Sequence, residues 1–160
     1  MTRIFSSVII QQPLERVFEY VTTPGNWPRW HRSSLAVTGA TNHSLEIGEQ
    51  VTEEFLVAGR LGRAVWTVVE RAVPTCWVIQ GRIVGSQQGG RVSYRLSRQA
   101  TGATLLEREL IYELRNPWQR LMDRLFVRAR VEHESSQAVN LLRERLEERA
   151  AASSTIRESL

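Results

Sequence analysis

The chain has 160 residues, of which 42% are hydrophobic, and a formal net charge of +4. This length favours one compact domain, and no apolar run approaches the roughly 20 residues that a membrane span needs. The first ten residues lack the apolar core and cleavage site of a signal peptide, so we expect a soluble, cytoplasmic protein. All 21 basic residues are arginine. They are scattered along the chain, with acidic residues between them through most of it, and form no basic patch, which argues against a nucleic-acid partner.

The N-terminal part of the chain predicts a strand, a short helix and an aromatic loop. Residues 3–10 are rich in β-formers, and Pro13 opens a helix, where its missing N–H is harmless. One face of this helix is apolar at helical spacing, with Leu14, Val17, Phe18 and Val21. The loop 22–34 follows, with a single helical turn expected near Trp30. Three of its side chains are interpreted as a rigid aromatic collar at the mouth of a cavity: Trp27, Trp30 and His31.

From residue 35 to residue 114 the hydrophobic period changes to two, and turn residues recur. This pattern predicts strands near 35–38, 49–58, 63–72, 76–84, 90–98 and 103–114. The connections are too short for the helical crossovers of a parallel sheet, so an antiparallel meander is expected.

The longest helical pattern begins at Asn116 and Pro117, as a cap and a first turn, and continues to about Arg149. Beyond it, residues 150–160 lose the pattern, so we expect a single domain over 1–149 and a frayed or disordered tail. One stripe of the helix is apolar and is predicted to lie on the sheet: Trp118, Leu121, Leu125, Val139, Leu142 and Leu146.

Polar side chains interrupt this stripe near its middle, at Arg128, Glu132, Ser135 and Ser136. An unpaired carboxylate buried against a sheet costs several kcal/mol, so a dry contact is not expected there. Two interpretations stay open. Either a polar or wet space lies beneath the helix, or Arg128 and Glu132 form an i,i+4 ion pair at the edge of the stripe.

Two charged residues share strand faces with apolar residues. Glu53 alternates with Val51 and Phe55, and Arg108 alternates with apolar residues of the last strand. Charges on an inward face are usually paired or turned to a ligand. A β-bulge would turn either charge outward. We favour the outward placement for Glu53, because Glu54 is adjacent and the phase is ambiguous, and the inward placement for Arg108.

Four aromatic residues come from four different predicted strands: Trp66, Trp77, Tyr94 and Tyr112. Core filling explains most such residues. Tyr94 and Tyr112 are better suited to line a site, because a buried phenol needs a hydrogen-bond partner.

Several segments together resemble the polyketide cyclase/dehydrase and lipid-transport branch of the START-like, Bet v 1-like (SRPBCC) superfamily. They are residues 13–21 (PLERVFEYV), 26–31 (NWPRWH), 48–51 (GEQV), 102–105 (GATL) and 121–126 (LMDRLF). The resemblance covers residues 3 to about 148. It implies an α+β helix-grip fold, in which a curved antiparallel β-sheet wraps around a long C-terminal helix and leaves a deep apolar cavity. Members of the family bind lipids, sterols, polyketides, quinones or other hydrophobic molecules, and some cyclise or dehydrate polyketides.

The leading hypothesis is therefore a carrier or sensor that binds a small hydrophobic or aromatic molecule, with Arg108 or Glu132 orienting one polar group of the ligand. The predicted ligand-binding residues are Trp27, Trp30, His31, Phe55, Trp66, Trp77, Tyr94, Arg108, Tyr112, Leu125 and Glu132. The alternative is an enzyme of cyclase or dehydratase type. In that case His31 or Glu132 would be the general base, and Arg108 would stabilise an enolate. Whether any reaction follows binding stays open.

A second alternative is a protein-interaction module that uses the sheet face or the arginine-rich helix, and a homodimer is also considered. No cofactor is expected. One cysteine and three dispersed histidines offer no metal-ligand spacing, so no metal site is expected either.

Overall fold

A computed structural model describes residues 1–57, 59–113 and 127–158, with side chains as far as residue 152. Its elements include every strand predicted from the sequence. In chain order they are β1 (Thr2–Ile10), α1 (Leu14–Thr22), η1 (Pro24–Asn26), α2 (Trp27–Trp30), β2 (Ser34–Gly39), β3 (Gln50–Val57), β4 (Arg60–Ala72), β5 (Cys76–Ile83), β6 (Gly89–Arg98), β7 (Thr104–Tyr112) and α4 (Arg128–Glu158).

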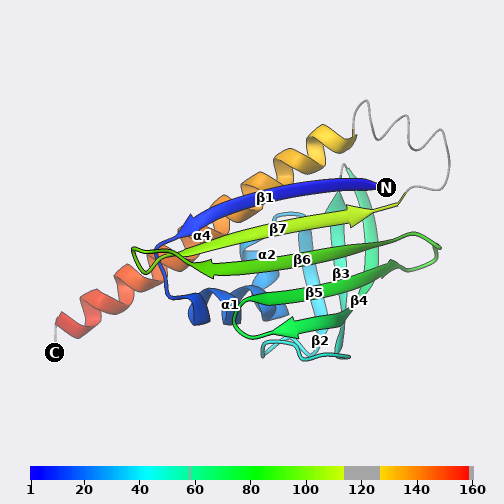
Figure 1. The fold of residues 1–160 in the computed structure, drawn as a ribbon. Helices are drawn as coiled ribbons and strands as arrows, with labels where there is room; N and C mark the ends of the chain where they lie inside the picture. Colours follow the sequence, from blue (N-terminus) through cyan, green and yellow to red (C-terminus); the bar gives the residue numbers. More distant parts are fainter. Residues whose placement is uncertain (58, 114–126, 159–160) are drawn as a thin grey trace.

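The strands form one curved antiparallel sheet in the order β1-β7-β6-β5-β4-β3-β2 (Figure 1). Strands β2 to β7 are a meander, as the short connections predicted, and β1 pairs with the last strand from Thr2 opposite Tyr112 to Ile10 opposite Thr104. The helix α4 packs along β1 and against α2. The α+β helix-grip architecture is thereby confirmed.

The hydrophobic stripe of α4 is confirmed where the structure describes it. Val139, Leu142 and Leu146 are buried, because they face the sheet and α2. The other predicted stripe residues, Trp118, Leu121 and Leu125, and the predicted helix start at Asn116 lie outside the described residues. The helix ends at Glu158, so helical backbone continues beyond Arg149, where the apolar pattern ends.

The short helices cover one end of the sheet. All four predicted apolar residues of α1 are buried, namely Leu14, Val17, Phe18 and Val21. The helical turn predicted near Trp30 is confirmed as α2, and the 3-10 turn η1 precedes it. The indole of Trp27 donates from Nε1 to the Val21 carbonyl at 3.0 Å, which ties α2 to α1.

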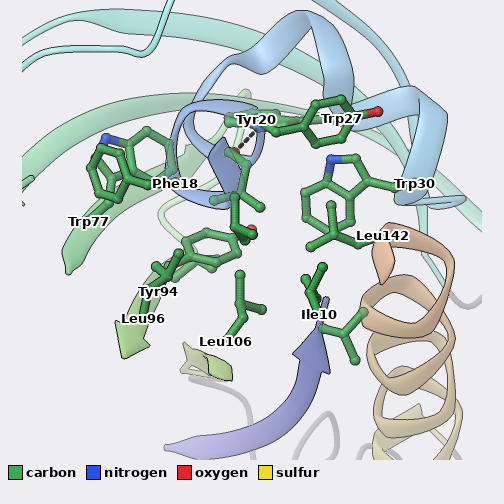
Figure 2. Close-up of a cluster of buried hydrophobic side chains, with 14 of the residues drawn as sticks. Ile10, Phe18, Tyr20, Trp27, Trp30, Trp77, Tyr94, Leu96, Leu106 and Leu142 are labelled. Atoms are coloured by element: carbon green, nitrogen blue, oxygen red, sulfur yellow. Dashed lines mark hydrogen bonds between the residues drawn. The ribbon is translucent and has the colours of Figure 1, made fainter. Parts of the chain in front are cut away.

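The predicted aromatic collar at a cavity mouth is wrong for its two tryptophans. Trp27 and Trp30 are 5% and 1% exposed and belong to the main hydrophobic core (Figure 2). The rings of Trp27 and Trp77 meet edge to face at 6.3 Å, and Trp77 in turn packs on Tyr94 at 5.8 Å. Because the loop folds into helical turns beneath α1 and against α4, its indoles fill the core.

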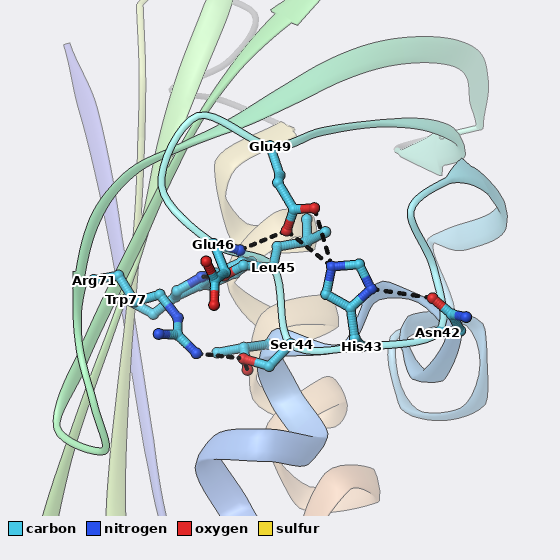
Figure 3. Close-up of polar contacts among 9 residues, drawn as sticks. Asn42, His43, Ser44, Leu45, Glu46, Glu49, Arg71 and Trp77 are labelled. Carbon is cyan, nitrogen blue, oxygen red and sulfur yellow. Dashed lines mark hydrogen bonds and ion pairs between the residues drawn. The ribbon is translucent and has the colours of Figure 1, made fainter.

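The loop between β2 and β3 covers this same end of the sheet (Figure 3). Leu45 is fully buried, and its carbonyl accepts a 3.2 Å hydrogen bond from Trp77 Nε1. His43 Nε2 lies 2.9 Å from a carboxylate oxygen of Glu49, and Glu49 also accepts a hydrogen bond from the Glu46 amide. The β2–β3 loop thus closes this end of the sheet, whereas the β3–β4 and β5–β6 turns lie at the opposite end.

Across the described ranges, no helix is both long enough and apolar enough to span a bilayer.

Candidate functional site

A cavity of about 230 Å³ lies at the end of the sheet opposite the buried loop. It is lined by the end of β3, the start of β4, the end of β5, the start of β6 and the end of β7. These segments adjoin one another because neighbouring strands are antiparallel. The first turns of α4 supply the remaining wall through Val131, Glu134 and Ser135. The wall is mainly apolar, with Phe55, Trp66, Ile83 and Leu110 among its side chains.

Two glycines allow the aromatic rings of the cavity wall to lie against the sheet. Trp66 is paired with Gly81 across β4 and β5, and a Cβ at Gly81 would lie 2.5 Å from the indole. Phe55 is paired with Gly62 across β3 and β4, where a Cβ would lie 2.4 Å from the ring. A glycine has no side chain, so each ring occupies the space over the neighbouring strand. The width of the cavity therefore depends on these glycines.

Arg108 is the buried charge at the inner part of this cavity, as its strand position predicted. It is 5% exposed. Its guanidinium donates to Ser135 Oγ at 2.8 Å and to the Tyr94 hydroxyl at 3.4 Å, and it lies 3.5 Å from His31 Nε2. All three partners are uncharged groups, and no carboxylate of the described residues lies within ion-pair distance. The positive charge of Arg108 is therefore not neutralised by an ion pair with any of these partners.

His31 borders the cavity next to Arg108. Burial, and then the charge of Arg108, lowers the pKa of His31 from 6.5 to about 3, so the ring is neutral at physiological pH. Because Nε2 faces a guanidinium N–H, we assign Nε2 as the acceptor and place the ring proton on Nδ1. Nδ1 is buried without a hydrogen-bond partner among the described residues. His31 is suited to hydrogen bonding there and is a weak base.

Glu53 points inward, contrary to the prediction. It is 8% exposed, and its Oε2 accepts a 2.7 Å hydrogen bond from Trp66 Nε1. The bulges in this part of the sheet lie elsewhere, on β2 near Ser34 and on β4 near Val68, whereas β3 pairs with β4 in unbroken register. Glu53 therefore stays on the face of its apolar neighbours. Burial raises the pKa of Glu53, while hydrogen bonding and the charge of Arg108 oppose that rise.

A second, smaller space of about 40 Å³ lies beside the cavity. Arg108 and His31 line both spaces, and Glu53 and Tyr94 line the smaller one. Trp27 and Trp30 complete its wall with two aliphatic residues of β5 and β6. We call this space the inner chamber. Burial, partly offset by Arg108, raises the pKa of Tyr94, so its phenol stays protonated and can donate a hydrogen bond.

Glu132 does not reach the cavity. Its carboxylate pairs with Arg128 Nε at 2.8 Å, and both side chains are about half exposed. The ion-pair interpretation is therefore confirmed for these two residues. The polar-space interpretation holds for Ser135, three residues after Glu132, because Ser135 is buried, borders the cavity, and bonds both Arg108 and Ser6 Oγ.

The structure brings together only part of the predicted set. The cavity wall contains His31, Phe55, Trp66, Arg108 and Tyr112. The inner chamber adds Trp27, Trp30 and Tyr94, whereas Trp77 belongs to the core alone. Leu125 lies outside the described residues. Among the residues that the sequence did not single out as ligand-binding are Ser33, Glu53, Glu134 and Ser135; only Glu53 and Ser135 carried a signal, as polar residues inside apolar patterns.

Residues 1–147 match the family model described as polyketide cyclase/dehydrase and lipid transport. The chain belongs to this family. The family description supports a general role in binding hydrophobic molecules or in polyketide-related chemistry. No curated protein matches the chain at a significant level.

Solved structures share the fold at low sequence identity. The protein TTHA0849 from Thermus thermophilus is 15% identical with a TM-score of 0.71, covering 95% of this chain and 99% of its own. A START superfamily protein from Mycobacterium smegmatis is 14% identical with a TM-score of 0.58, covering 92% and 95%. DynU16, of the dynemicin biosynthetic locus, is 17% identical with a TM-score of 0.65, covering 91% of this chain and 47% of DynU16. The chain thus spans about half of DynU16.

Proposed function

We propose that the protein binds one small hydrophobic or aromatic molecule in the cavity, as a carrier or sensor for a compound such as a polyketide, a quinone or a lipid. The observation that carries this proposal is the mainly apolar 230 Å³ cavity with a buried arginine at its inner part. Apolar pockets with a few convergent polar groups are the usual form of small-molecule sites.

The size of the cavity favours compact ligands. An engineered apolar cavity of about 150 Å³ accepts benzene, so the described walls leave room for a molecule of one or two rings. Burial of its apolar surface, worth about 25 cal/mol per Å², would supply most of the affinity. Arg108 would fix the orientation of an oxygen atom.

Native mass spectrometry of the freshly purified protein, followed by solvent extraction, tests this function. We expect a bound compound that leaves on denaturation. Val131→Phe should abolish its binding by filling the cavity, whereas Ala129→Phe, on the exposed side of the same helix, should retain it. A folded protein that carries nothing and takes up no small aromatic compound would contradict the proposal.

A second candidate, an enzyme of cyclase or dehydratase type, is favoured by Glu53 rather than by the bases predicted from the sequence. Glu132 faces solvent and His31 is a weak base, whereas Glu53 borders the inner chamber together with Arg108. Its carboxylate would remove a proton from the carbon next to a bound carbonyl, and the electron pair would move to the oxygen beside Arg108.

Deuterium exchange at the α-carbon of 2-tetralone, followed by NMR in D₂O, tests this chemistry. Catalysis predicts exchange that is lost in Glu53→Gln while 2-tetralone still binds. Equal exchange in wild type and Glu53→Gln would exclude Glu53 as the base.

A further inference from the structure

The inner chamber has a buried arginine on one wall and a buried glutamate on another. Arg108 comes from β7 and Glu53 from β3, with β6, β5 and β4 between them in the sheet, so the two side chains approach from opposite sides of the concave face. They do not form an ion pair within 4 Å. About 40 Å³ of space borders both. This volume corresponds to roughly three water molecules, or to one polar group of a ligand.

The charges around this space disfavour an ionic guest. A carboxylate near Arg108 would also meet Glu53, and Glu134 borders the adjoining cavity. A cation near Glu53 would meet Arg108. A neutral group that both accepts and donates a hydrogen bond can bond to Arg108 and to Glu53 at once. This matters because buried charged groups are costly when they lack hydrogen-bond partners.

Hydrogen bonds already hold both side chains in place. Trp66 Nε1 donates to one oxygen of Glu53, and Ser135 and Tyr94 hold the guanidinium of Arg108. The Trp66 indole itself depends on the space over Gly81. The two polar groups are therefore pre-organised before a ligand arrives, which lowers the entropic cost of binding.

We propose that the cavity selects ligands with an uncharged hydroxyl at their inner end, a phenol, enol or alcohol, which accepts a hydrogen bond from Arg108 and donates one to Glu53. This inference rests on the proposed binding function and names its ligand class. The apolar rings of the ligand lie in the larger cavity against Trp66 and Phe55, and the hydroxyl occupies the inner chamber.

Four bicyclic probes of nearly equal size test the inference: naphthalene, 2-naphthol, 2-methoxynaphthalene and 2-naphthoate. Dissociation constants are measured at pH 7 by fluorescence titration or calorimetry. We expect 2-naphthol to bind at least about tenfold more tightly than the other three, as one or two hydrogen bonds to charged groups provide. The methoxy compound accepts a hydrogen bond but cannot donate one, so it should bind more weakly than 2-naphthol. Because its methyl group is also larger, this loss is assigned to Glu53 only if 2-naphthol loses its advantage over the ether in Glu53→Gln.

Two variants with matched controls assign the effect to residues. Glu53→Gln and Arg108→Met should each reduce the preference for 2-naphthol over naphthalene to less than about threefold. Glu54→Gln and Arg95→Met, which alter exposed neighbours of the same charge, should preserve it. Thermal melting verifies that each variant is folded. If a variant does not fold, the comparison of the four probes on the wild-type protein still tests the inference.

Each other outcome has a distinct meaning. Tightest binding of 2-naphthoate would overturn the inference and identify an anion site at Arg108. Equal binding of naphthalene and 2-naphthol would also overturn it, since water would then fill the inner chamber. Failure of all four probes to bind would contradict the proposed function itself, whereas binding without hydroxyl preference contradicts only the ligand class.

Discussion

At the scale of single residues, the cavity is defined by polar groups that the fold removes from water. Arg108 is hydrogen-bonded to neutral partners, and His31 is kept uncharged. Glu53 is buried and accepts a hydrogen bond from the Trp66 indole. Each of these arrangements costs folding free energy, because water would solvate the groups better. Such groups are therefore expected to influence stability as well as binding.

His31→Gln should make the protein less sensitive to acid. In the wild type the unfolded chain binds a proton near pH 6.5, while the folded chain does so only near pH 3. The unfolded state thus holds more protons between these values, so wild-type stability falls as the pH falls through this window. Relative to His31→Gln, the wild type should lose about 1.4 kcal/mol more per pH unit near pH 5. Urea unfolding at pH 7, 5.5 and 4.5 measures the difference; parallel pH profiles would refute it.

Ser135→Ala should destabilise the protein by about 1–3 kcal/mol, because it leaves a guanidinium N–H of Arg108 without its partner in a buried place. The control is Ser136→Ala, an exposed neighbour on the same helix, which should change stability by less than about 0.5 kcal/mol. Chemical denaturation compares the two. Equal small effects would mean that water replaces the serine hydroxyl.

At the scale of secondary-structure elements, the cavity depends on how adjacent strands share space. Trp66 of β4 lies over Gly81 of β5, and Phe55 of β3 lies over Gly62 of β4. The sheet thereby carries its aromatic rings on its concave face without pushing α4 away. The helix contributes Val131, Glu134 and Ser135 to the cavity wall, and Ser135 is buried there.

Gly81→Ala should move the Trp66 indole and weaken its hydrogen bond to Glu53, because the new Cβ would lie 2.5 Å from the ring. We expect a loss of about 1–3 kcal/mol of stability and a shift in tryptophan fluorescence. In a Trp66→Ala background the same change should cost little, so the double-mutant cycle should show a coupling above about 1 kcal/mol. Additive effects would show that the glycine does not position the indole.

At the scale of the whole molecule, the two ends of the sheet differ in how tightly they are packed. The end covered by α1, α2 and the β2–β3 loop is filled by tryptophans, and the opposite end contains the cavity. The packed end supports a rigid frame, and the cavity end carries polar groups that disfavour folding. Ligand binding should therefore stabilise the molecule as a whole.

Saturating 2-naphthol should raise the melting temperature of the protein. At a ligand concentration of 100 times the dissociation constant the gain is about 2.7 kcal/mol, or roughly 5–10 °C for a domain of this size. Differential scanning fluorimetry over a concentration series measures it. Val131→Phe should show no concentration-dependent shift, and Ala129→Phe should match the wild type. A shift that persists in Val131→Phe would place the ligand elsewhere.

The architecture was predictable from local patterns, whereas the site was predictable only in part. Alternating residues along β3 to β7 and the helical spacing of Leu142 and Leu146 follow directly from which face is buried. The side of Glu53 was predicted wrongly, because a bulge changes the phase of a strand and its position depends on neighbouring strands. Trp30 was predicted to lie at a cavity mouth but is buried in the core. The local sequence does not show which helix covers this side chain.

The sequence by itself determined the order of the elements, the antiparallel sheet and the inward charge of Arg108, since periodicity and turn residues act over a few positions of the chain. Tertiary structure alone decided that Arg108 meets Ser135, that Glu132 turns to solvent, and that Glu53 shares a chamber with Arg108. These relations join strands and a helix that are far apart in the chain. They depend on register, twist and helix placement, which no local pattern specifies.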